Sequence, residues 1–208
     1  MYHKPLSSIK NILFDLGGVI IPINQELTFQ SFASKCGWDI ENVKVFFKKN
    51  DFLKNYENGT LSTEEFLNTI EQHLLLSRHE IIDSWNKLLL EIPHSRIELL
   101  KKLKQRYRIY LLSNTNDLHI YAINNQLKTR NLQPLEQIFN KVYYSYKIKY
   151  SKPSVDAYQY VLRDAQMNPL ETLFLDDSKE NTEGAIKAGI NSIHIDSTSN
   201  LETLFNDL

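Results

Sequence analysis

Short apolar segments alternate with longer amphipathic segments along most of the chain, and this alternation restricts its fold more than any other feature. The segments predicted as strands are rich in branched and aromatic residues, and they cover Lys10 to Phe14, Arg108 to Leu112, Lys141 to Tyr146, Thr172 to Leu175 and Ser192 to Ile195. Helices are predicted over 93–105, 153–165 and 179–188. Strands that alternate with helices of this length form βαβ crossovers, so we predict an α/β fold with a parallel sheet covered on both faces.

One long stretch interrupts the alternation after the first strand. From about Gln25 to Leu90, apolar residues recur every three or four positions, and the segment from Ser62 to Glu65 is typical of a helix start. A short return strand is predicted just before this stretch, from Val19 to Ile23. We therefore expect two parts: a core domain over 1–22 and 91–208, and an inserted helical cap over 23–90.

Composition excludes several classes of protein. The 208 residues carry 24 Lys and Arg against 25 Asp and Glu, a net charge of −1, so no nucleic acid and no acidic membrane surface is expected as a partner. The single cysteine, Cys36, excludes an intramolecular disulfide and a cysteine-based zinc site. The N-terminal segment matches neither a signal peptide nor a membrane span, because Asp15 interrupts its short apolar run. A cytoplasmic protein is predicted, and the sequence indicates no particular protein partner.

Polar residues follow four of the predicted strands, at the edge of the sheet where ligands bind in open parallel sheets. They are Asp15 after the first strand, Ser113 and Asn114 after the second, Lys152 after the third, and Asp176 and Asp177 after the fourth. Taken singly, each has an ordinary structural explanation: the aspartates and Ser113-Asn114 as turn or helix-capping residues, and Lys152 as a solvated lysine. Their occurrence in order, each at a strand end, favours a functional site.

The chemistry of this set suits phosphoryl transfer. Asp15 offers a carboxylate nucleophile, Ser113 and Asn114 offer hydrogen-bond donors for phosphate oxygens, and Lys152 offers a positive charge. An anionic nucleophile and an anionic phosphate ester repel each other, and Mg²⁺, which prefers oxygen ligands, relieves that repulsion. The adjacent carboxylates of Asp176 and Asp177 are candidates to hold it.

Four segments of the chain, FDLGGV, LLSNTN, YSKPSVDAY and FLDDSKENTEGA, resemble the four motifs of the haloacid dehalogenase superfamily. They are most similar to its sugar-phosphatase branch, which includes bacterial α-D-glucose-1-phosphate phosphatases and the N-terminal phosphatase domain of soluble epoxide hydrolase. The resemblance covers nearly the whole chain. It implies a Rossmann-like core with a small inserted helical cap of the C1 type, and a Mg²⁺-dependent phosphatase acting on a small phosphorylated metabolite.

The resemblance also implies a role for each matching residue. Asp15 would be the nucleophile and a metal ligand, Ser113 and Asn114 would bind the transferred phosphate, and Lys152 would neutralise it. Asp177 corresponds to the direct Mg²⁺ ligand of the fourth motif, and Asp176 to a residue that contacts the ion through water or supports its direct ligands. Asn181 occupies the place of an orienting polar residue.

The chain departs from the superfamily pattern at Gly17. Most of these phosphatases have an aspartate two residues after the nucleophile, which protonates the leaving oxygen, whereas Gly17 offers only its backbone carbonyl as a metal ligand. General acid catalysis contributes about 10²–10⁴ in rate, or roughly 3–5 kcal/mol of barrier. Gly17 therefore favours a leaving group that departs easily without a proton, such as the anomeric oxygen of a sugar 1-phosphate or the leaving group of an acyl phosphate.

Three functions compete for this sequence. The leading hypothesis is hydrolysis of a small phosphomonoester through an aspartyl-phosphate on Asp15. A metal-free dehalogenase would have no use for Asp176 and Asp177 as metal ligands, and a catalytically weakened sensor that binds Mg²⁺ and a phosphometabolite is compatible with Gly17.

The cap is expected to select the substrate, because it closes over the site and contacts the part of the substrate that does not react. Its aromatic residues are candidates to line the pocket, although we favour the interpretation that they pack among the cap helices. They are Phe46, Phe47, Phe52, Tyr56 and Trp85.

Overall fold

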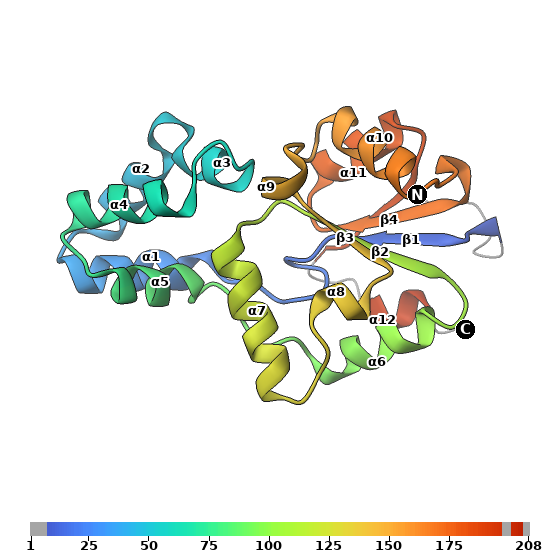
Figure 1. Cartoon of the computed structure of the whole chain (residues 1–208), viewed down its shortest axis with the longest axis horizontal. Helices are drawn as coiled ribbons and strands as arrows, with labels where there is room; N and C mark the ends of the chain where they lie inside the picture. The colour runs from blue at the N-terminus through green and yellow to red at the C-terminus, as the bar shows by residue number, and fades with distance from the viewer. Residues whose placement is uncertain (1–7, 197–200, 206–208) are drawn as a thin grey trace.

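A five-stranded sheet forms the centre of the computed structural model, which describes residues 8–196 and 201–205 (Figure 1). The strands are β1 (Asn11–Phe14), β2 (Arg108–Ser113), β3 (Lys141–Tyr144), β4 (Thr172–Asp176) and β5 (Asn191–His194). They lie in the order β3-β2-β1-β4-β5, and every neighbouring pair is parallel. The predicted parallel sheet is confirmed, and each strand ends within one or two residues of its predicted limits.

Helices cover both faces of this sheet. They are α6 (His94–Leu103), α7 (Asp117–Thr129), α8 (Leu135–Ile138), α9 (Ser145–Ile148), α10 (Val155–Asp164), α11 (Lys179–Lys187) and α12 (Leu201–Leu204), with a 3₁₀ turn, η3 (Pro169–Glu171), before β4. Ile12 and Phe14 of β1 belong to the same buried cluster as apolar residues of α6, α7 and α12. Leu13 belongs to a second cluster with residues of α10 and α11. Successive side chains of a strand point to opposite faces, which explains why one short strand contributes to two cores.

The predicted core helices are present with small shifts at their starts. Pro93 is the N-cap of α6 rather than its first residue. α10 begins at Val155, two residues after the predicted start, because the Ser154 side chain caps it by accepting a hydrogen bond from the Asp156 N–H. α7 is absent from the elements predicted above, although the Asn116 side chain caps it by accepting from the His119 N–H.

A block of helices follows β1 and lies to one side of the sheet (Figure 1). Its elements are α1 (Gln25–Cys36), α2 (Ile40–Lys48), η2 (Lys49–Asp51), α3 (Phe52–Glu57), α4 (Thr63–Leu74) and α5 (Arg78–Asn86). We call residues 23–90 the helical block. It has a buried apolar cluster of its own, built around Phe32, Phe47 and Phe66. The predicted helix start is confirmed, since Ser62 and Glu65 form a capping box at the beginning of α4.

The predicted return strand from Val19 to Ile23 is wrong. This segment is a turn in which the N–H groups of Ile20 and Ile21 both donate to the Leu16 carbonyl oxygen. Gly18 makes the reversal possible, because its φ of 72° lies in the left-handed region that glycine tolerates best. An isolated antiparallel bridge then joins Ile23 to Leu89, so the chain entering the helical block pairs with the chain leaving it.

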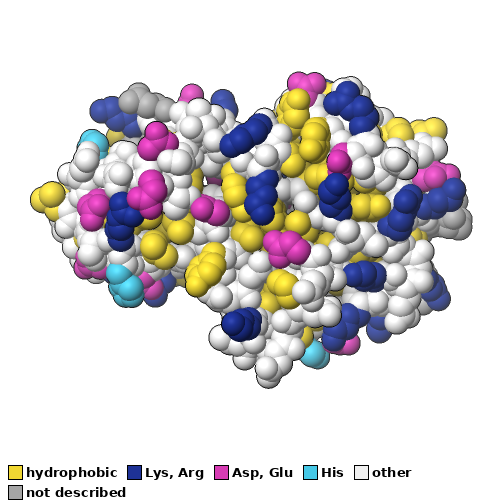
Figure 2. Space-filling view, viewed as in Figure 1, with side chains coloured by type: hydrophobic (Ala, Val, Ile, Leu, Met, Phe, Trp, Pro, Cys, Tyr) yellow, Lys and Arg dark blue, Asp and Glu magenta, His cyan; other side chains and the backbone are white. Residues whose placement is uncertain are grey.

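Charged side chains of both signs are interspersed on the face shown in Figure 2, as the balanced composition predicts. Among the residues that the structure describes, no helix combines the length and the apolar character needed to cross a membrane.

Candidate active site

Strand register brings the residues that follow β1 and β4 together. Phe14 pairs with Leu175, and the Asp15 backbone N–H donates to the Leu175 carbonyl oxygen at 2.8 Å. Asp15 therefore lies beside Asp176, the last residue of β4. The order of the strands reverses at β1, with β2 and β3 on one side and β4 and β5 on the other. In open α/β sheets ligands bind at such a switch point, outside the carboxyl ends of the strands.

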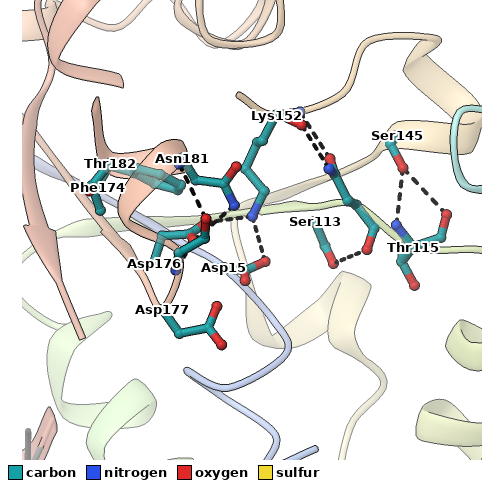
Figure 3. A network of polar contacts seen from close by, with 12 residues as sticks. Asp15, Ser113, Thr115, Ser145, Lys152, Phe174, Asp176, Asp177, Asn181 and Thr182 are labelled. Carbon is teal, nitrogen blue, oxygen red and sulfur yellow. Dashed lines mark hydrogen bonds and ion pairs between the residues drawn. The ribbon is translucent and has the colours of Figure 1, made fainter. Parts of the chain in front are cut away.

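Lys152 is the centre of the polar cluster at this edge (Figure 3). Its Nζ lies 2.6 Å from Asp15 Oδ1 and 2.6 Å from Asp176 Oδ2, and its side chain is only 1% exposed. Burial alone would lower the pKa of Lys152, but the two adjacent carboxylates outweigh this effect and the net pKa is raised. The lysine therefore remains a cation between two carboxylates.

The carboxylates of the cluster carry more negative charge than Lys152 neutralises. Burial is the largest influence on Asp15 and raises its pKa to about 7, with Asp176 adding to the rise and Lys152 opposing it. Burial also raises the pKa of Asp177, again with a contribution from Asp176. Both pKa values are raised because burial and a neighbouring negative charge disfavour the ionised form of a carboxyl group. A bound cation would offset this negative charge.

The geometry and donor chemistry of the cluster fit a hard divalent cation. Asp15, Asp176 and Asp177 each offer a carboxylate oxygen, and these oxygens lie within 4.8 Å of one another. Both carboxylate oxygens of Asp176 already have partners. Oδ2 contacts Lys152, and Oδ1 accepts hydrogen bonds from the Ser178 N–H at 2.8 Å and from Asn181 Nδ2 at 2.9 Å. An all-oxygen donor set of this kind suits Mg²⁺.

Asp177 differs from Asp176 in its surroundings. Its carboxylate makes no hydrogen bond to another residue in the described part of the chain, and it lines the same cavity as Asp15 and Gly17. In Figure 3 its side chain lies apart from the hydrogen-bonded network around Asp176. Of the two adjacent aspartates, Asp177 thus has the freer oxygens.

Ser113 and Asn114 end β2 and reach the site in different ways. Ser113 is buried and lines the cavity beside Asp15. The Asn114 side chain forms two hydrogen bonds with the Lys152 backbone, donating from Nδ2 to the carbonyl oxygen and accepting at Oδ1 from the N–H, each at 2.9 Å. The Asn114 amide group is therefore engaged in holding the segment that contains Lys152.

Lys152 does not directly follow a strand, contrary to its predicted place. β3 ends at Tyr144, and α9 and a short loop lie between that strand and the lysine. The paired hydrogen bonds to Asn114 return the segment to the edge of the sheet. The prediction that Lys152 joins Asp15 and Asp176 is nevertheless correct in space.

Gly17 lies in the cavity wall two residues after Asp15. A Cβ atom at this position would meet the Ile23 side chain at 3.4 Å, which is ordinary contact, and its backbone φ is outside the left-handed region. A Cβ atom at position 17 is therefore compatible with the surrounding packing.

The cavity above the cluster has a volume of about 320 Å³ and lies between the strand ends and the helical block. Of the five aromatic candidates, only Trp85 lines it. Phe47 and Tyr56 are buried in the apolar cluster of the helical block, and Phe46 and Phe52 pack against that cluster. The favoured interpretation as packing residues holds for all five, and Trp85, which is buried in the same cluster, lines the cavity as well.

Two ionisable residues of the cavity were not predicted from the sequence. Glu57, at the end of α3, and His119, in α7, both line it. Neither belongs to a strand end or to one of the four motifs, so no spacing pattern distinguishes them from other polar residues of amphipathic helices. Only the packing of the helical block against the sheet edge reveals them.

The fold and site together define a class: Rossmann-like α/β enzymes with an acidic, lysine-containing site at the switch point of a parallel sheet. Comparison with known proteins then gives the family. The sequence profile of the haloacid dehalogenase-like hydrolases matches residues 9–189, and the chain belongs to this family of hydrolases. The family indicated by the four motifs is thereby confirmed.

Two curated relatives have named activities. A D-ribitol-5-phosphate phosphatase from Bacteroides thetaiotaomicron is 29% identical over 176 residues, covering 83% of this chain and 85% of the relative. A sesquiterpene phosphatase from Aspergillus oryzae is 23% identical over 194 residues, covering 91% of each.

Solved structures give the same family. A haloacid dehalogenase family enzyme from Bacteroides thetaiotaomicron, in complex with magnesium and inorganic phosphate, is 32% identical with a TM-score of 0.86, covering 95% of this chain and 99% of that one. A HAD-like hydrolase from Porphyromonas gingivalis is 30% identical with a TM-score of 0.84, covering 96% and 97%. A dehalogenase at 21% identity and a TM-score of 0.62, covering 93% and 87%, shares the fold alone.

Proposed function

We propose that this chain is a Mg²⁺-dependent phosphatase that hydrolyses a small phosphomonoester through an aspartyl-phosphate on Asp15. The observation that carries the proposal is the convergence of Asp15, Lys152, Asp176 and Asp177 at one switch point, with Lys152 2.6 Å from two of these carboxylates. Relatives named as phosphatases, and a similar structure with bound magnesium and phosphate, support it.

In the first step a carboxylate oxygen of Asp15 attacks phosphorus, and the bond from phosphorus to the ester oxygen breaks. Water then attacks the aspartyl-phosphate, which releases inorganic phosphate and restores the carboxylate. Lys152 holds positive charge beside the attacking oxygen and offsets the charge of the phosphoryl group. Ser113 and the backbone of Asn114 bind the phosphate oxygens, since the Asn114 side chain is engaged with Lys152.

Asp15, Asp177 and the Gly17 carbonyl oxygen would hold the Mg²⁺ ion. Asp176 would support them without direct coordination, because hydrogen bonds and Lys152 already occupy both of its oxygens. Asn181 fixes the orientation of Asp176 by donating to Oδ1 at 2.9 Å. The ion would supply charge neutralisation at the transferring phosphoryl group.

The helical block acts as the cap that covers this site. Trp85 and Glu57 belong to the block and line the cavity above Asp15, which supports the division into a core of 1–22 and 91–208 and a cap of 23–90. A cavity of about 320 Å³ suits a small phosphorylated metabolite. We place the protein in the cytoplasm, which its single cysteine favours.

The leaving group depends on how the ester oxygen receives a proton. With Gly17 in place of the usual aspartate, a sugar 1-phosphate is favoured if no other residue supplies that proton. If another residue does supply it, phosphates of ordinary alcohols such as the D-ribitol 5-phosphate hydrolysed by the named relative are equally accessible.

The experiment compares wild type with Asp15→Asn on a panel of sugar, polyol, acyl and nucleotide phosphates, with and without Mg²⁺. Asp156→Asn, at an exposed aspartate in α10, is the matched control. We expect phosphate release by wild type and the control only with Mg²⁺, and none by Asp15→Asn. Phosphate release by Asp15→Asn at the wild-type rate would disprove the nucleophile. Binding of Mg²⁺ and a phosphate ester without turnover in wild type would identify a sensor instead.

A further inference from the structure

The proposed reaction needs a proton for the leaving oxygen, and Gly17 cannot provide it. The ionisable residues that line the cavity, among those the structure describes, are Asp15, Glu57, His119, Lys152 and Asp177. Asp15 is the attacking group, Asp177 is a proposed metal ligand, and Lys152 is an ammonium group held between two carboxylates. The two other ionisable residues of the cavity are Glu57 and His119.

His119 is a poor proton donor because its ring is engaged on both sides. One ring nitrogen, Nε2, contacts the Trp85 carbonyl oxygen at 3.2 Å, and the other, Nδ1, contacts Asn116 Nδ2 at 3.0 Å. These partners require Nε2–H to donate to the carbonyl and Nδ1 to accept from the amide, which is the neutral tautomer. Burial lowers the pKa of His119 to about 4, so no proton is available for transfer near neutral pH.

We propose that Glu57 is the catalytic proton donor of this phosphatase. The proposal rests on the proposed function. When the bond from Asp15 to phosphorus forms and the ester bond breaks, the Glu57 carboxylic acid gives its proton to the departing oxygen. The Glu57 carboxylate then takes a proton from the attacking water as the bond between Asp15 and phosphorus breaks. The sum is ester plus water giving alcohol plus inorganic phosphate, with Glu57 restored.

The surroundings of Glu57 are those of an acid kept free for a ligand. It lines the cavity together with Asp15 and Lys152. Its carboxylate makes no hydrogen bond or ion pair with any residue in the described ranges 8–196 and 201–205. Burial raises the pKa of Glu57 to about 7, with the charge of Lys152 opposing the rise. A group with a pKa near the working pH serves best as both acid and base.

Contacts on both sides of Glu57 hold it in place over the site. The Tyr56 hydroxyl donates to Asp117 Oδ1 at 2.8 Å, and the Ser145 hydroxyl donates to the carbonyl oxygen of Glu57 itself. Lys149 Nζ donates to the Gly59 carbonyl oxygen at 2.7 Å. These bonds join the end of α3 to α7 and to the α9 segment of the core. They fix the end of α3, and with it the backbone of Glu57, against the core.

Gly59 allows this close approach. A Cβ atom at position 59 would lie 2.3 Å from Lys149 Nζ and 2.4 Å from the Tyr146 carbonyl oxygen, and the φ of Gly59 is +72°. Only glycine accepts that conformation without strain and leaves room for the α9 segment. The sequence therefore contains a local device, two residues after Glu57, that brings the end of α3 against the core.

The test compares two substrates that differ in how much their leaving group needs a proton. Phenyl phosphate and 4-nitrophenyl phosphate have similar shapes, and neither has a hydroxyl group for Glu57 to bind, but 4-nitrophenolate is much the weaker base and leaves unprotonated. With Mg²⁺ present, Glu57→Gln should lower kcat/KM for phenyl phosphate by about 10²-fold or more and change it only a few-fold for 4-nitrophenyl phosphate. Loss of the base should also produce a burst of 4-nitrophenol followed by slow turnover.

Glu41→Gln is the matched control, because this carboxylate of the helical block is 81% exposed and lies on α2. It should leave both substrates unchanged. An equal fall of kcat/KM for both substrates in Glu57→Gln would show that Glu57 binds or positions the ester, and no fall for either would show that it takes no part. Both results overturn the proposal while leaving the phosphatase function standing. Failure of wild type to hydrolyse any phosphate ester removes the phosphatase function and the proposal with it.

Gly17→Asp gives an independent measurement that does not depend on the folding of Glu57→Gln. A Cβ atom at position 17 would meet the Ile23 side chain at 3.4 Å, and the backbone at Gly17 is not in the left-handed region. In a chain that already has Glu57 as its acid, Gly17→Asp should raise kcat/KM for phenyl phosphate by less than about tenfold, whereas a chain limited by a missing acid would gain about 10²-fold or more. In the Glu57→Gln background the same substitution should restore hydrolysis of phenyl phosphate. A large gain in the wild-type background would contradict the role of Glu57.

Discussion

His119 should make the stability of this protein fall with pH in the mildly acidic range. Its ring is buried, stacks on Trp85 with centroids 4.9 Å apart, and uses both nitrogens for hydrogen bonds in the neutral form. Burial lowers its pKa from the ordinary 6.5 to about 4. Above pH 6.5 the ring is neutral in both the folded and the unfolded state. Below it the unfolded state takes up the proton first, so the free energy of unfolding decreases until the folded state is also protonated near pH 4.

The magnitude follows from the two pKa values. The full difference corresponds to about 3 kcal/mol, and the share lost between pH 7.5 and pH 5 is about 2 kcal/mol. His119→Gln removes the titrating ring, so it should also remove this loss of about 2 kcal/mol in the free energy of unfolding between pH 7.5 and pH 5. The other buried acids of the cavity are present in both proteins, so the difference between the two stability profiles reports on the histidine.

Urea unfolding of wild type, His119→Gln and His79→Gln at pH 7.5 and pH 5, without metal, measures the effect. His79 is an exposed histidine in α5, and its variant should follow wild type. We expect wild type to lose about 2 kcal/mol more than His119→Gln over this interval. Parallel profiles, or an NMR titration of His119 with a pKa above about 6, would refute the reasoning.

Three further outcomes are expected. Lys152→Met leaves the Asp15 and Asp176 carboxylates without their shared cation. It should therefore lower the free energy of unfolding by about 3–5 kcal/mol at pH 7.5 with a chelator present, as measured by urea unfolding. An unchanged unfolding midpoint would contradict this. Gly18→Ala puts a Cβ atom 2.1 Å from Asp177 Oδ2 at a residue whose φ is +72°. It should therefore destabilise the fold by about 1–3 kcal/mol and weaken Mg²⁺ binding measured by calorimetry. A wild-type affinity for Mg²⁺ would show that the turn adapts. Mg²⁺ at 100 times its Kd should stabilise wild type by about 2.7 kcal/mol, and the same concentration should stabilise Asp177→Asn by much less, as measured by thermal unfolding. An equal stabilisation of the two proteins would show that the ion binds elsewhere.

The parallel sheet and most of the residues at its edge follow from the local pattern of the sequence. Alternation of apolar strands with helices is a local property, and parallel strands necessarily present their carboxyl ends along one edge. This is why Asp15, Ser113 and Asp176 could be expected to meet before their positions were known. The segment from Val19 to Ile23 differs from its predicted structure, because apolar residues next to a glycine are compatible with a strand or a turn and only the hydrogen bonds to Leu16 distinguish the two.

Tertiary structure alone decided two other features. Lys152 reaches Asp15 through α9 and a loop, and its place depends on two hydrogen bonds with Asn114, 38 residues away in sequence. Glu57 faces the cavity because Tyr56, Ser145 and Gly59 contacts turn the end of α3 toward the sheet. Helical periodicity specifies which side of a helix is apolar, but not which polar residue at its end meets another part of the chain. That choice depends on contacts between segments far apart in the chain.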